Sequence, residues 1–312
     1  LGIIDGAVGS SRRVWVTIRE TLVLLCIAIG LTPAFKMKFW NIGAEGQILV
    51  GGMATAALMI YAGDAMPNWL LLILIFIASA AAGLIWGLIP AVFKAYFNTN
   101  ETLFTLMLNY VAMQLVTFAI VFWENPSGSN TVGIINAAGQ KGWFPSIFGN
   151  MYGLNVIVVL IITLGMYVYM KYSKQGYEIA VVGESQNTAR YAGINVKKVI
   201  IRTMMLSGAI CGIAGCRIVS GASHTISTST AGGRGFTAII VAWMSKFNPF
   251  AMILVSAFLV FMQQGSIQIA SQFGLNENAS DIVTGILLFF LIGCEFFINY
   301  KLEWKKNHKE GK

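Results

Sequence analysis

The sequence predicts an all-α, polytopic integral membrane protein with about 8 full transmembrane helices and additional short or broken apolar segments. Composition is the first reason: of 312 residues, 56% are apolar and only 11% are charged, whereas an ordinary soluble domain has roughly 25% charged residues. The second reason is that apolar runs close to the roughly 20 residues of a bilayer-spanning helix recur along the chain. We therefore expect a single transmembrane domain over residues 1–312, embedded in the lipid bilayer, and exclude a water-soluble globular protein.

The apolar segments are unequal in length. Three are short for a full crossing, at about 21–35, 47–61 and 235–245. The first two flank the polar residues 41–47, and the third follows the flexible stretch 220–235. Such interruptions are typical of transporter helices that are broken near the substrate path. The remaining predicted spans lie at about 69–93, 102–123, 154–170, 199–219, 250–270 and 282–300.

Lysine and arginine positions predict the orientation, because cytoplasmic loops are rich in both residues. Two regions stand out, residues 171–202 and the C-terminal tail from residue 301. We expect both to be cytoplasmic, with a loop at about 171–198, and the hydrophilic stretch at about 124–150 to be external. The two basic regions share a side only if the short segment 235–245 crosses the membrane.

Three arginines near the start of the sequence, Arg12, Arg13 and Arg19, are external in this topology and break the positive-inside rule. A further span before Leu1 would place them in an external segment. We therefore expect an N-terminal span that the sequence does not contain. An internal location of these arginines would overturn the first crossing.

Motifs that would give the chain its own chemistry are absent from the sequence. No GxxxxGK[ST] phosphate loop is present, so ATP must be bound by a partner if it is used. No catalytic grouping or dinucleotide fingerprint occurs, and we expect neither an enzyme nor a bound cofactor. The 4 cysteines and 2 histidines are scattered, which argues against disulfides and a metal site. The basic residues lie between apolar runs rather than on one solvated face, so no nucleic acid is expected as a partner.

Polar residues at the edges of the apolar runs are candidates for the substrate path. An ionisable group near hydrocarbon is costly unless it is paired or faces water, which singles out the glutamates of NIGAEGQ and NTNETLF. Each carboxylate has an alternative role, which is to cap a broken helix or to lie at the cytoplasmic interface. The candidate set is Asn41, Glu45, Gln47, Asn100, Glu101 and Asn109.

The polar stretch at residues 176–199 predicts a short exposed helix. Ser185 is suited to cap a helix over residues 186–191, and Gly193 to end it in a left-handed conformation. A helix of two turns has little stability alone. We therefore expect it to rest against the rest of this chain or against a soluble partner.

Gly208 and Gly212 form a GxxxG pattern within the apolar segment 199–219. Small residues at this spacing allow the backbones of two membrane helices to approach closely. The pattern predicts a helix-packing face.

Several motifs together resemble the permease subunits of bacterial ABC importers for nucleosides and simple sugars, the ribose-type family. NIGAEGQILVGG and ARYAGINV are specific in combination, and the resemblance covers nearly all of the chain. The stretch at 24–40 is less typical of the family. The matching motifs lie at residues 6–10, 41–52, 100–110, 189–196 and 233–249.

The resemblance implies an importer in the bacterial plasma (inner) membrane with several partners. These are cytoplasmic ATP-binding subunits, a second permease subunit that is identical or related, and an external substrate-binding protein. It favours nucleosides over free sugars as cargo. Within the cytoplasmic coupling loop at about 171–198, we expect residues 185–193 to be a coupling helix seated in a groove of the ATPase, because this segment is capped at both ends, is flanked by basic residues and joins two spans directly. Arg190 would meet acidic groups there, and Tyr191 with Ala189 would fill the groove. The proposed coupling residues are Gly183, Glu184, Ser185, Asn187, Arg190, Tyr191 and Gly193.

The main alternative is a proton-coupled secondary transporter. In that case Glu45 or Glu101 would bind the coupling proton. Energy source separates the two functions, because an importer permease without partners transports nothing.

Overall fold

The computed structural model describes residues 2–146 and 152–274 and the single positions 282, 285, 286, 289, 290 and 293. Seven of the described helices are long and apolar enough to cross a membrane, namely α2, α3, α4, α5, α6, α9 with η1, and α11. The predicted all-α membrane fold is therefore confirmed, while most of the predicted span at 282–300 and the C-terminal tail fall outside the described residues. In chain order the elements are α1 (Gly2–Val8), α2 (Ser11–Lys36), α3 (Ala44–Ala62), α4 (Asn68–Phe97), α5 (Glu101–Trp123), α6 (Gly153–Tyr172), α7 (Lys174–Glu184), α8 (Gln186–Tyr191), α9 (Val196–Ile218), the π-helix η1 (Val219–Ser223), α10 (Arg234–Met244) and α11 (Pro249–Gln272).

The chain forms two compact units. The smaller unit comprises residues 1–17 and the residues from 258 onward. Within it α1 packs on the second half of α11, because a Cβ added at Gly6 would lie 2.6 Å from the Cβ of Gln268. An ion pair of 2.8 Å joins Arg13 to Asp5. The larger unit, residues 18–257, contains all the candidate site residues.

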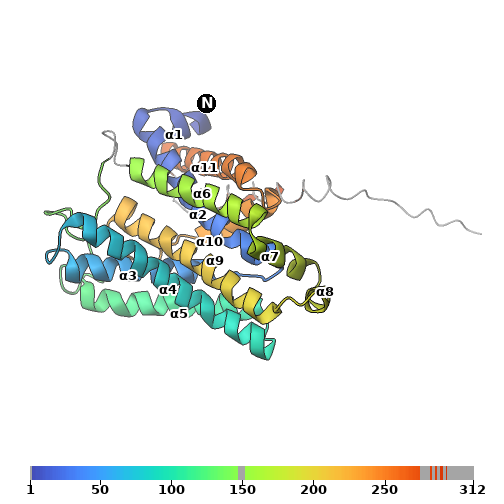
Figure 1. Ribbon diagram of the computed structural model, residues 1–312. Coiled ribbons are helices and arrows are strands. Elements are labelled where there is room, and N and C mark those ends of the chain that lie inside the picture. Colours follow the sequence, from blue (N-terminus) through green and yellow to red (C-terminus); the bar gives the residue numbers. More distant parts are fainter. Residues whose placement is uncertain are drawn as a thin grey trace, which may run out of the picture. The chain divides into compact units, whose positions relative to one another are not determined.

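The centre of the larger unit is formed by α3, α4 and α9, which lie side by side, with α5 packed against α3 (Figure 1). Glycines allow their backbones to approach closely. A Cβ at Gly51 would lie 2.5 Å from the Cα of Gly212, and a Cβ at Gly83 would overlap the carbonyl oxygen of Gly208. Such contact stabilises helix pairs in lipid, where no hydrophobic effect drives them together. The packing face predicted from Gly208 and Gly212 is confirmed.

The helix bundle of the larger unit has two ends, which we call the loop end and the α8 end. The loop end holds residues 124–146, the end of α3 and the start of α4. There the Nδ2 of Asn136 donates to the carbonyl oxygen of Met59, and the N–H of Gly142 donates to the Oδ1 of Asn68, each at 2.7 Å. The α8 end holds α7, α8, the end of α4 and the start of α9 (Figure 1).

Asparagines set several helix boundaries at the α8 end. The Oδ1 of Asn100 accepts from the N–H groups of Thr102 and Leu103 and thereby caps α5. Asn98 ends α4 in a left-handed conformation with φ of 50°. Asn195 caps α9 by accepting from the N–H of Lys198 at 3.1 Å. These local signals explain why an apolar stretch as long as residues 68–123 divides into two helices.

The helix α10 is too short to cross a bilayer alone. Its 11 residues span about 16 Å, against about 30 Å of hydrocarbon. An irregular stretch precedes it and begins at the loop end, where the N–H of Ile135 donates to the carbonyl oxygen of His224 at 2.8 Å. α10 ends beside the turn after α2, with the Trp243 ring stacked on Trp40 at a centroid distance of 5.5 Å. Irregular chain and a short helix together therefore run from the loop end to the turn after α2, and the membrane crossing expected at 235–245 stays a prediction.

Candidate functional site

The turn that leads into α3 lies inside the bundle and is held by side chains. Asn109 on α5 contacts it twice: its Oδ1 accepts from the N–H of Gly46 at 2.8 Å, and its Nδ2 donates to the carbonyl oxygen of Ile42 at 3.0 Å. Asn41 is fully buried and donates to the Oγ of Ser207 on α9 at 3.3 Å. Irregular backbone is tolerated at membrane depth only where such partners satisfy it.

Glu45 links the start of α3 to the start of α10. Its Oε1 accepts a hydrogen bond of 2.7 Å from the N–H of Gly235, and the residue is only 8% exposed. The first N–H groups of a helix have no partner within the helix, so a carboxylate placed there is favourable. The starts of α3 and of the short helix α10 therefore lie side by side, each after irregular chain, and transporters build polar sites at such interruptions.

Gln47 completes a buried polar cluster around this junction. It is 1% exposed, and its side-chain amide lies 3.5 Å from that of Asn41. A donor remains unused beside the turn, because the Nε1 of Trp86 is buried without a hydrogen-bond partner in the described part of the chain. A Cβ added at Gly46 would lie 3.0 Å from that nitrogen. Of the predicted substrate-path residues, the structure brings four together here, namely Asn41, Glu45, Gln47 and Asn109.

The other two predicted substrate-path residues lie apart from this cluster, at the α8 end. Asn100 caps α5 with its side chain. The carboxylate of Glu101 pairs with the Nζ of Lys94 at 2.8 Å, across the turn between α4 and α5. Glu101 thus lies in the first turn of α5, at the end of the bundle. This position fits the alternative role that the sequence left open for it, in which the carboxylate lies near a helix start or at the interface.

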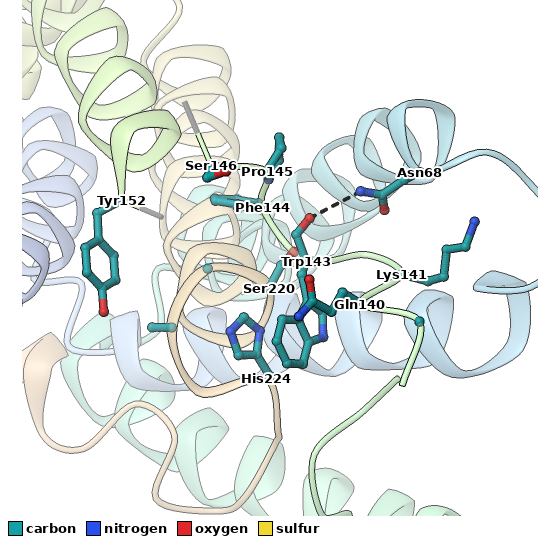
Figure 2. A pocket seen from close by; sticks show the side chains of 13 residues that line it. Asn68, Gln140, Lys141, Trp143, Phe144, Pro145, Ser146, Tyr152, Ser220 and His224 are labelled. Atoms are coloured by element: carbon teal, nitrogen blue, oxygen red, sulfur yellow. Dashed lines mark hydrogen bonds between the residues drawn. The ribbon is translucent and has the colours of Figure 1, made fainter. Parts of the chain in front are cut away.

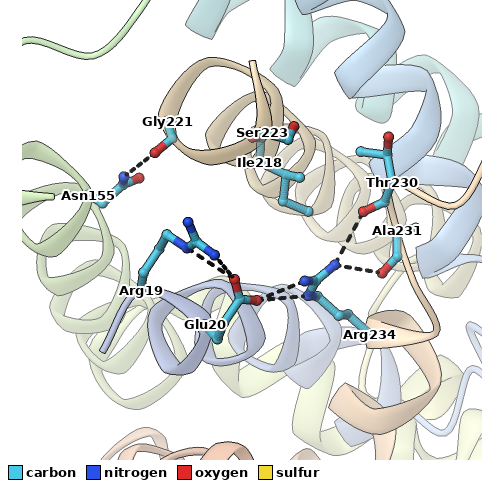
Figure 3. A network of polar contacts seen from close by, with 9 residues as sticks. All are labelled: Arg19, Glu20, Asn155, Ile218, Gly221, Ser223, Thr230, Ala231 and Arg234. Atoms are coloured by element: carbon cyan, nitrogen blue, oxygen red, sulfur yellow. Dashed lines mark hydrogen bonds and ion pairs between the residues drawn. The ribbon is translucent and has the colours of Figure 1, made fainter. Parts of the chain in front are cut away.

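A network of charges lies beside the irregular stretch before α10 (Figure 3). The Oε1 of Glu20 accepts from Arg19 and its Oε2 accepts from Arg234, each through two guanidinium nitrogens at 2.7–3.2 Å. Arg234 also donates to the carbonyl oxygen of Thr230 at 3.3 Å. The network borders a cavity of about 260 Å³ that is rich in hydroxyl groups, from Ser223, Thr225, Ser227, Ser229 and Thr230.

Arg217, in the last turn of α9, is buried completely. Its Nε donates to the Oδ1 of Asn155 at 3.1 Å and its Nη1 to the carbonyl oxygen of Leu22 at 3.0 Å. Its Nη2 has no hydrogen-bond partner among the described residues. A buried arginine held by neutral acceptors is costly in a membrane protein and marks a site of special function or packing.

These charged residues are not among the site residues predicted from the sequence. Arg19 enters only the prediction of orientation, and Glu20, Arg217 and Arg234 have no predicted role. The available signal was the one applied to Glu45, an ionisable residue at the edge of an apolar run. Their pairing could not be inferred, because Glu20 and Arg234 are distant in sequence and meet only through the folded irregular stretch.

The predicted short helix at the α8 end is present with its expected boundaries. α8 spans Gln186–Tyr191, and the Oγ of Ser185 accepts from the N–H of Thr188 at 3.2 Å. Gly193 follows with φ of +76°, the left-handed conformation that favours glycine. The side chain of Tyr191 is 93% exposed, and Glu184, Asn187 and Arg190 are exposed as well.

Two residues near α8 face their own chain rather than a partner. Ala189 is completely buried in an apolar cluster with Val182, Val196 and Met204, so the expectation that it fills a partner's groove is wrong. Gly183 packs against the end of α2, where a Cβ would overlap the carbonyl oxygen of Lys36. Both residues therefore fix the position of α8, while the contact surface is left to its exposed side chains.

At the loop end, residues 124–146 pack on the neighbouring helices and line a cavity of about 590 Å³ together with them (Figure 2). The ring of Trp143 stacks on His224 with 3.7 Å between the centroids, and its Nε1 donates to the carbonyl oxygen of Ile135 at 2.9 Å. The N–H of Phe144 donates to the carbonyl oxygen of Ser220 at 3.2 Å. Burial, and secondarily the nearby Arg19, lowers the pKa of His224 from its ordinary value.

The fold and the junction of α3 and α10 at Glu45 together define a class of protein. The described part of the chain has seven helices that are apolar enough to span a membrane, and a buried polar cluster lies where α3 and the short helix α10 begin, which is typical of membrane transport proteins. The chain belongs to the family described as branched-chain amino acid transport system / permease component, and the model of this family matches residues 16–292. It is a multi-pass membrane permease and not an enzyme, and the resemblance to ABC importer permeases is confirmed.

Three curated relatives illustrate the similarity. The guanosine ABC transporter permease protein NupP of Bacillus subtilis (strain 168) is 30% identical over 290 residues, which cover 92% of this chain and 83% of the relative. The nucleoside ABC transporter permease protein NupB of Lactococcus lactis subsp. cremoris is 26% identical over 307 residues, covering 95% and 83%. The glucose ABC transporter permease protein TsgB13 of Haloferax volcanii is 28% identical over 294 residues, covering 90% and 76%. No solved structure matches the chain.

Proposed function

We propose that the chain is the membrane-spanning subunit of an ATP-driven importer that moves a nucleoside across the bacterial plasma membrane by alternating access. The observation that carries this proposal is the junction of α3 and α10, where Glu45 near the start of α3 caps the short helix α10 through the N–H of Gly235. Both helices begin inside the bundle after irregular chain, as do the interrupted helices at the substrate sites of transporters. The junction is thus suited to open toward either face of the membrane.

The energy source in this proposal is outside the chain. The sequence contains no phosphate-binding loop, so ATP hydrolysis requires separate ATP-binding subunits. A second permease subunit and an external substrate-binding protein complete the assembly. The basic residues from 171 to 202 lie at the end of α6 and on α7, α8 and α9, which supports a cytoplasmic α8 end and, with it, a cytoplasmic C-terminus.

The helix α8 is the proposed contact with the ATP-binding subunit. Ala189 anchors it on its own chain, and Arg190 and Tyr191 project from the other side. Only a short turn separates α8 from α9, and the start of α9 belongs to the same apolar cluster as α7 and α8. A force on the exposed side chains is therefore transmitted to α9 and to the α3 and α4 helices packed on it.

A nucleoside cargo is supported by two independent observations. The names of two relatives specify guanosine and nucleosides, and that of a third specifies glucose. The cavity beside Arg234 is lined by several hydroxyl groups, which suit a neutral solute that carries hydroxyls of its own.

Uptake by the complete transporter tests this function. Proteoliposomes that contain the permease, its partner permease and the ATP-binding subunits, supplied with the binding protein, should accumulate labelled guanosine and adenosine only with ATP. Entry of labelled ribose or glucose without nucleoside entry would contradict the cargo assignment.

A matched experiment separates the importer from a secondary transporter. Liposomes that contain this chain alone should show no uptake when a proton gradient is imposed. Proton-driven uptake by the chain alone, lost in Glu45→Gln, would overturn the proposal.

A further inference from the structure

A third cavity, of about 520 Å³, lies at the α8 end between the last turn of α4 and the loop that joins α8 to α9. Its polar lining comes from three separate elements. α4 contributes Lys94 and Tyr96, α8 contributes Gln186 and Arg190, and the start of α9 contributes Asn195 and Lys197. The cavity is separate from the junction at Glu45, and it shares Arg190 with the exposed surface of α8.

The cavity carries an excess of positive charge. Lys94 is paired with Glu101 at 2.8 Å, but none of the acidic residues in the described chain lines the cavity beside Arg190 or Lys197. The Nζ of Lys197 lies 4.7 Å from the centre of the Tyr96 ring. The start of α9 adds the partial positive charge of a helix N-terminus. These groups together favour an anion.

An exposed aromatic surface adjoins the charged cavity on α4. Tyr96 lines the cavity and is 60% exposed, while Phe93 and Phe97 on the same helix are 41% and 70% exposed. Phe93 also stacks on Phe104 of α5 at 4.9 Å. α4 is one of the membrane-spanning helices, so these rings lie where acyl chains meet the polar interface. Aromatic side chains are enriched at that depth.

We propose that this cavity binds the phosphate group of an anionic phospholipid, with the acyl chains lying along Phe93 and Phe97. Basic pockets between membrane helices are suited to anionic head groups. The adjoining aromatic surface favours a lipid over a free anion, because acyl chains would cover the exposed faces of Phe93 and Phe97, which an inorganic phosphate cannot do. The same surface favours a lipid over an acidic side chain of a protein partner. The inference depends on the bilayer and not on the cargo.

A lipid in this position would contact α4, α8 and α9 at once. Its phosphate would lie between Arg190 on α8 and Lys197 on α9, and its chains beside Phe97 on α4. The bound lipid would therefore stabilise the attachment of α8 to the rest of the chain. The proposal makes phosphatidylglycerol, an anionic phospholipid, the natural probe.

Two neighbouring lysines provide a matched pair of variants for the test. Lys197 lines the cavity, and Lys198 is exposed beside it but does not. The full-length chain with its partners, purified in mild detergent with added phosphatidylglycerol, is examined by native mass spectrometry. Lys197→Gln should weaken phosphatidylglycerol retention about fivefold, because one basic contact is lost, whereas Lys198→Gln should retain the lipid as the unmodified chain does. Thermal unfolding in phosphatidylcholine, which should not differ between the variants, checks that both are folded.

Three outcomes would overturn the proposal. The first is equal phosphatidylglycerol retention by Lys197→Gln and Lys198→Gln. The second is displacement of the lipid by glycerol 3-phosphate at the same concentration as by phosphatidylglycerol itself, which would identify a site for anions without acyl chains. The third is loss of the ATP-binding subunit from Lys197→Gln with lipid retention unchanged, which would identify an acidic group of that subunit as the occupant. Weakened retention of phosphatidylglycerol in Phe97→Ala would support the position of the acyl chains.

Discussion

The carboxylate of Glu45, near the start of α3, accepts a 2.7 Å hydrogen bond from the backbone N–H of Gly235, near the start of α10. One side chain thus closes the gap between two helices that both begin inside the bundle. A neutral amide oxygen can accept the same hydrogen bond, so the hydrogen bond and the negative charge can be separated experimentally.

Substitutions of Glu45 should therefore differ in effect. Glu45→Gln should keep most ATP-driven guanosine uptake by the complete transporter in proteoliposomes, since its side-chain oxygen can still accept from Gly235. Glu45→Ala leaves a buried N–H without an acceptor, which costs about 1–3 kcal/mol, and should lower both the thermal unfolding temperature and uptake. Equal loss of uptake in the two variants would show that the charge, and not the hydrogen bond, is required.

Gly193 should be needed for its backbone conformation. Its φ of +76° costs a β-branched residue at least about 1–2 kcal/mol, although a Cβ there would meet no atom within 4 Å. Gly193→Val should reduce cargo-stimulated ATP hydrolysis and co-purification of the ATP-binding subunit, whereas Gly193→Asn, which tolerates this conformation, should retain both. Full retention of both by the valine variant would contradict the coupling role.

Charge reversal on the exposed face of α8 should uncouple the transporter. Arg190→Glu should leave the permease in the membrane but weaken co-purification of the ATP-binding subunit, while Arg190→Lys should keep the charge and most of the binding. Because Arg190 also lines the basic cavity, the comparison is made in phosphatidylcholine without anionic lipid. Unchanged co-purification by Arg190→Glu would limit α8 to packing on its own chain.

Replacing glycine by alanine should lower the unfolding temperature at Gly212 but not at Gly165. A Cβ at Gly212 would overlap the carbonyl oxygen of Ser79, whereas a Cβ at Gly165 on α6 has no atom within 4 Å. Gly212→Ala should separate α9 from α4 at a cost of about 1–3 kcal/mol and lower the unfolding temperature in detergent. Gly165→Ala should leave that temperature unchanged or raise it slightly. Similar unfolding temperatures would refute tight packing at Gly212.

Acid should loosen the attachment of residues 124–146. The pKa of His224 is lowered by burial and, to a smaller extent, by Arg19, so the folded protein favours the neutral ring that stacks on Trp143. Stability should be constant above the ordinary histidine pKa of about 6.5 and should fall as the pH drops below it toward the lowered value. Hydrogen-exchange protection of residues 132–146, measured relative to the intrinsic exchange rate at each pH, should be weaker at pH 5 than at pH 8. His224→Phe, which keeps a stacked ring, should lose this dependence; its persistence would assign it to another group.

Local patterns were sufficient to predict the helices and their ends. Ser185 and Gly193 bound α8 where expected because capping and left-handed conformations depend on a few neighbouring residues. The interruption before α3 was equally visible, since polar residues stand out in an apolar chain. The packing of Gly208 and Gly212 followed from their spacing alone.

Contacts between distant segments could not be predicted in the same way. Nothing in the sequence pairs Glu20 with Arg234, and Glu101 looked equivalent to Glu45 until the fold placed them at different depths. The sequence does not show whether a small apolar residue such as Ala189, on a short polar helix, contacts its own chain or a partner. Only the tertiary packing shows that Ala189 is covered by its own chain. The structure leaves each predicted substrate-path role as a prediction for uptake measurements.

Because its backbone contacts that of α4 closely, α9 is expected to move as a rigid rod. Its 23 residues extend over about 35 Å, so a tilt of about 5° at α8 displaces the far end by about 3 Å. That far end continues into η1 and His224, where the N–H of Ile135 is bonded. In the proposed coupling mechanism, a movement of α8 would therefore be carried along α9 and increased by its length before it reaches the segment at the loop end. Electron-spin distances between labels on residues 187 and 138, recorded with and without ATP, would register this displacement.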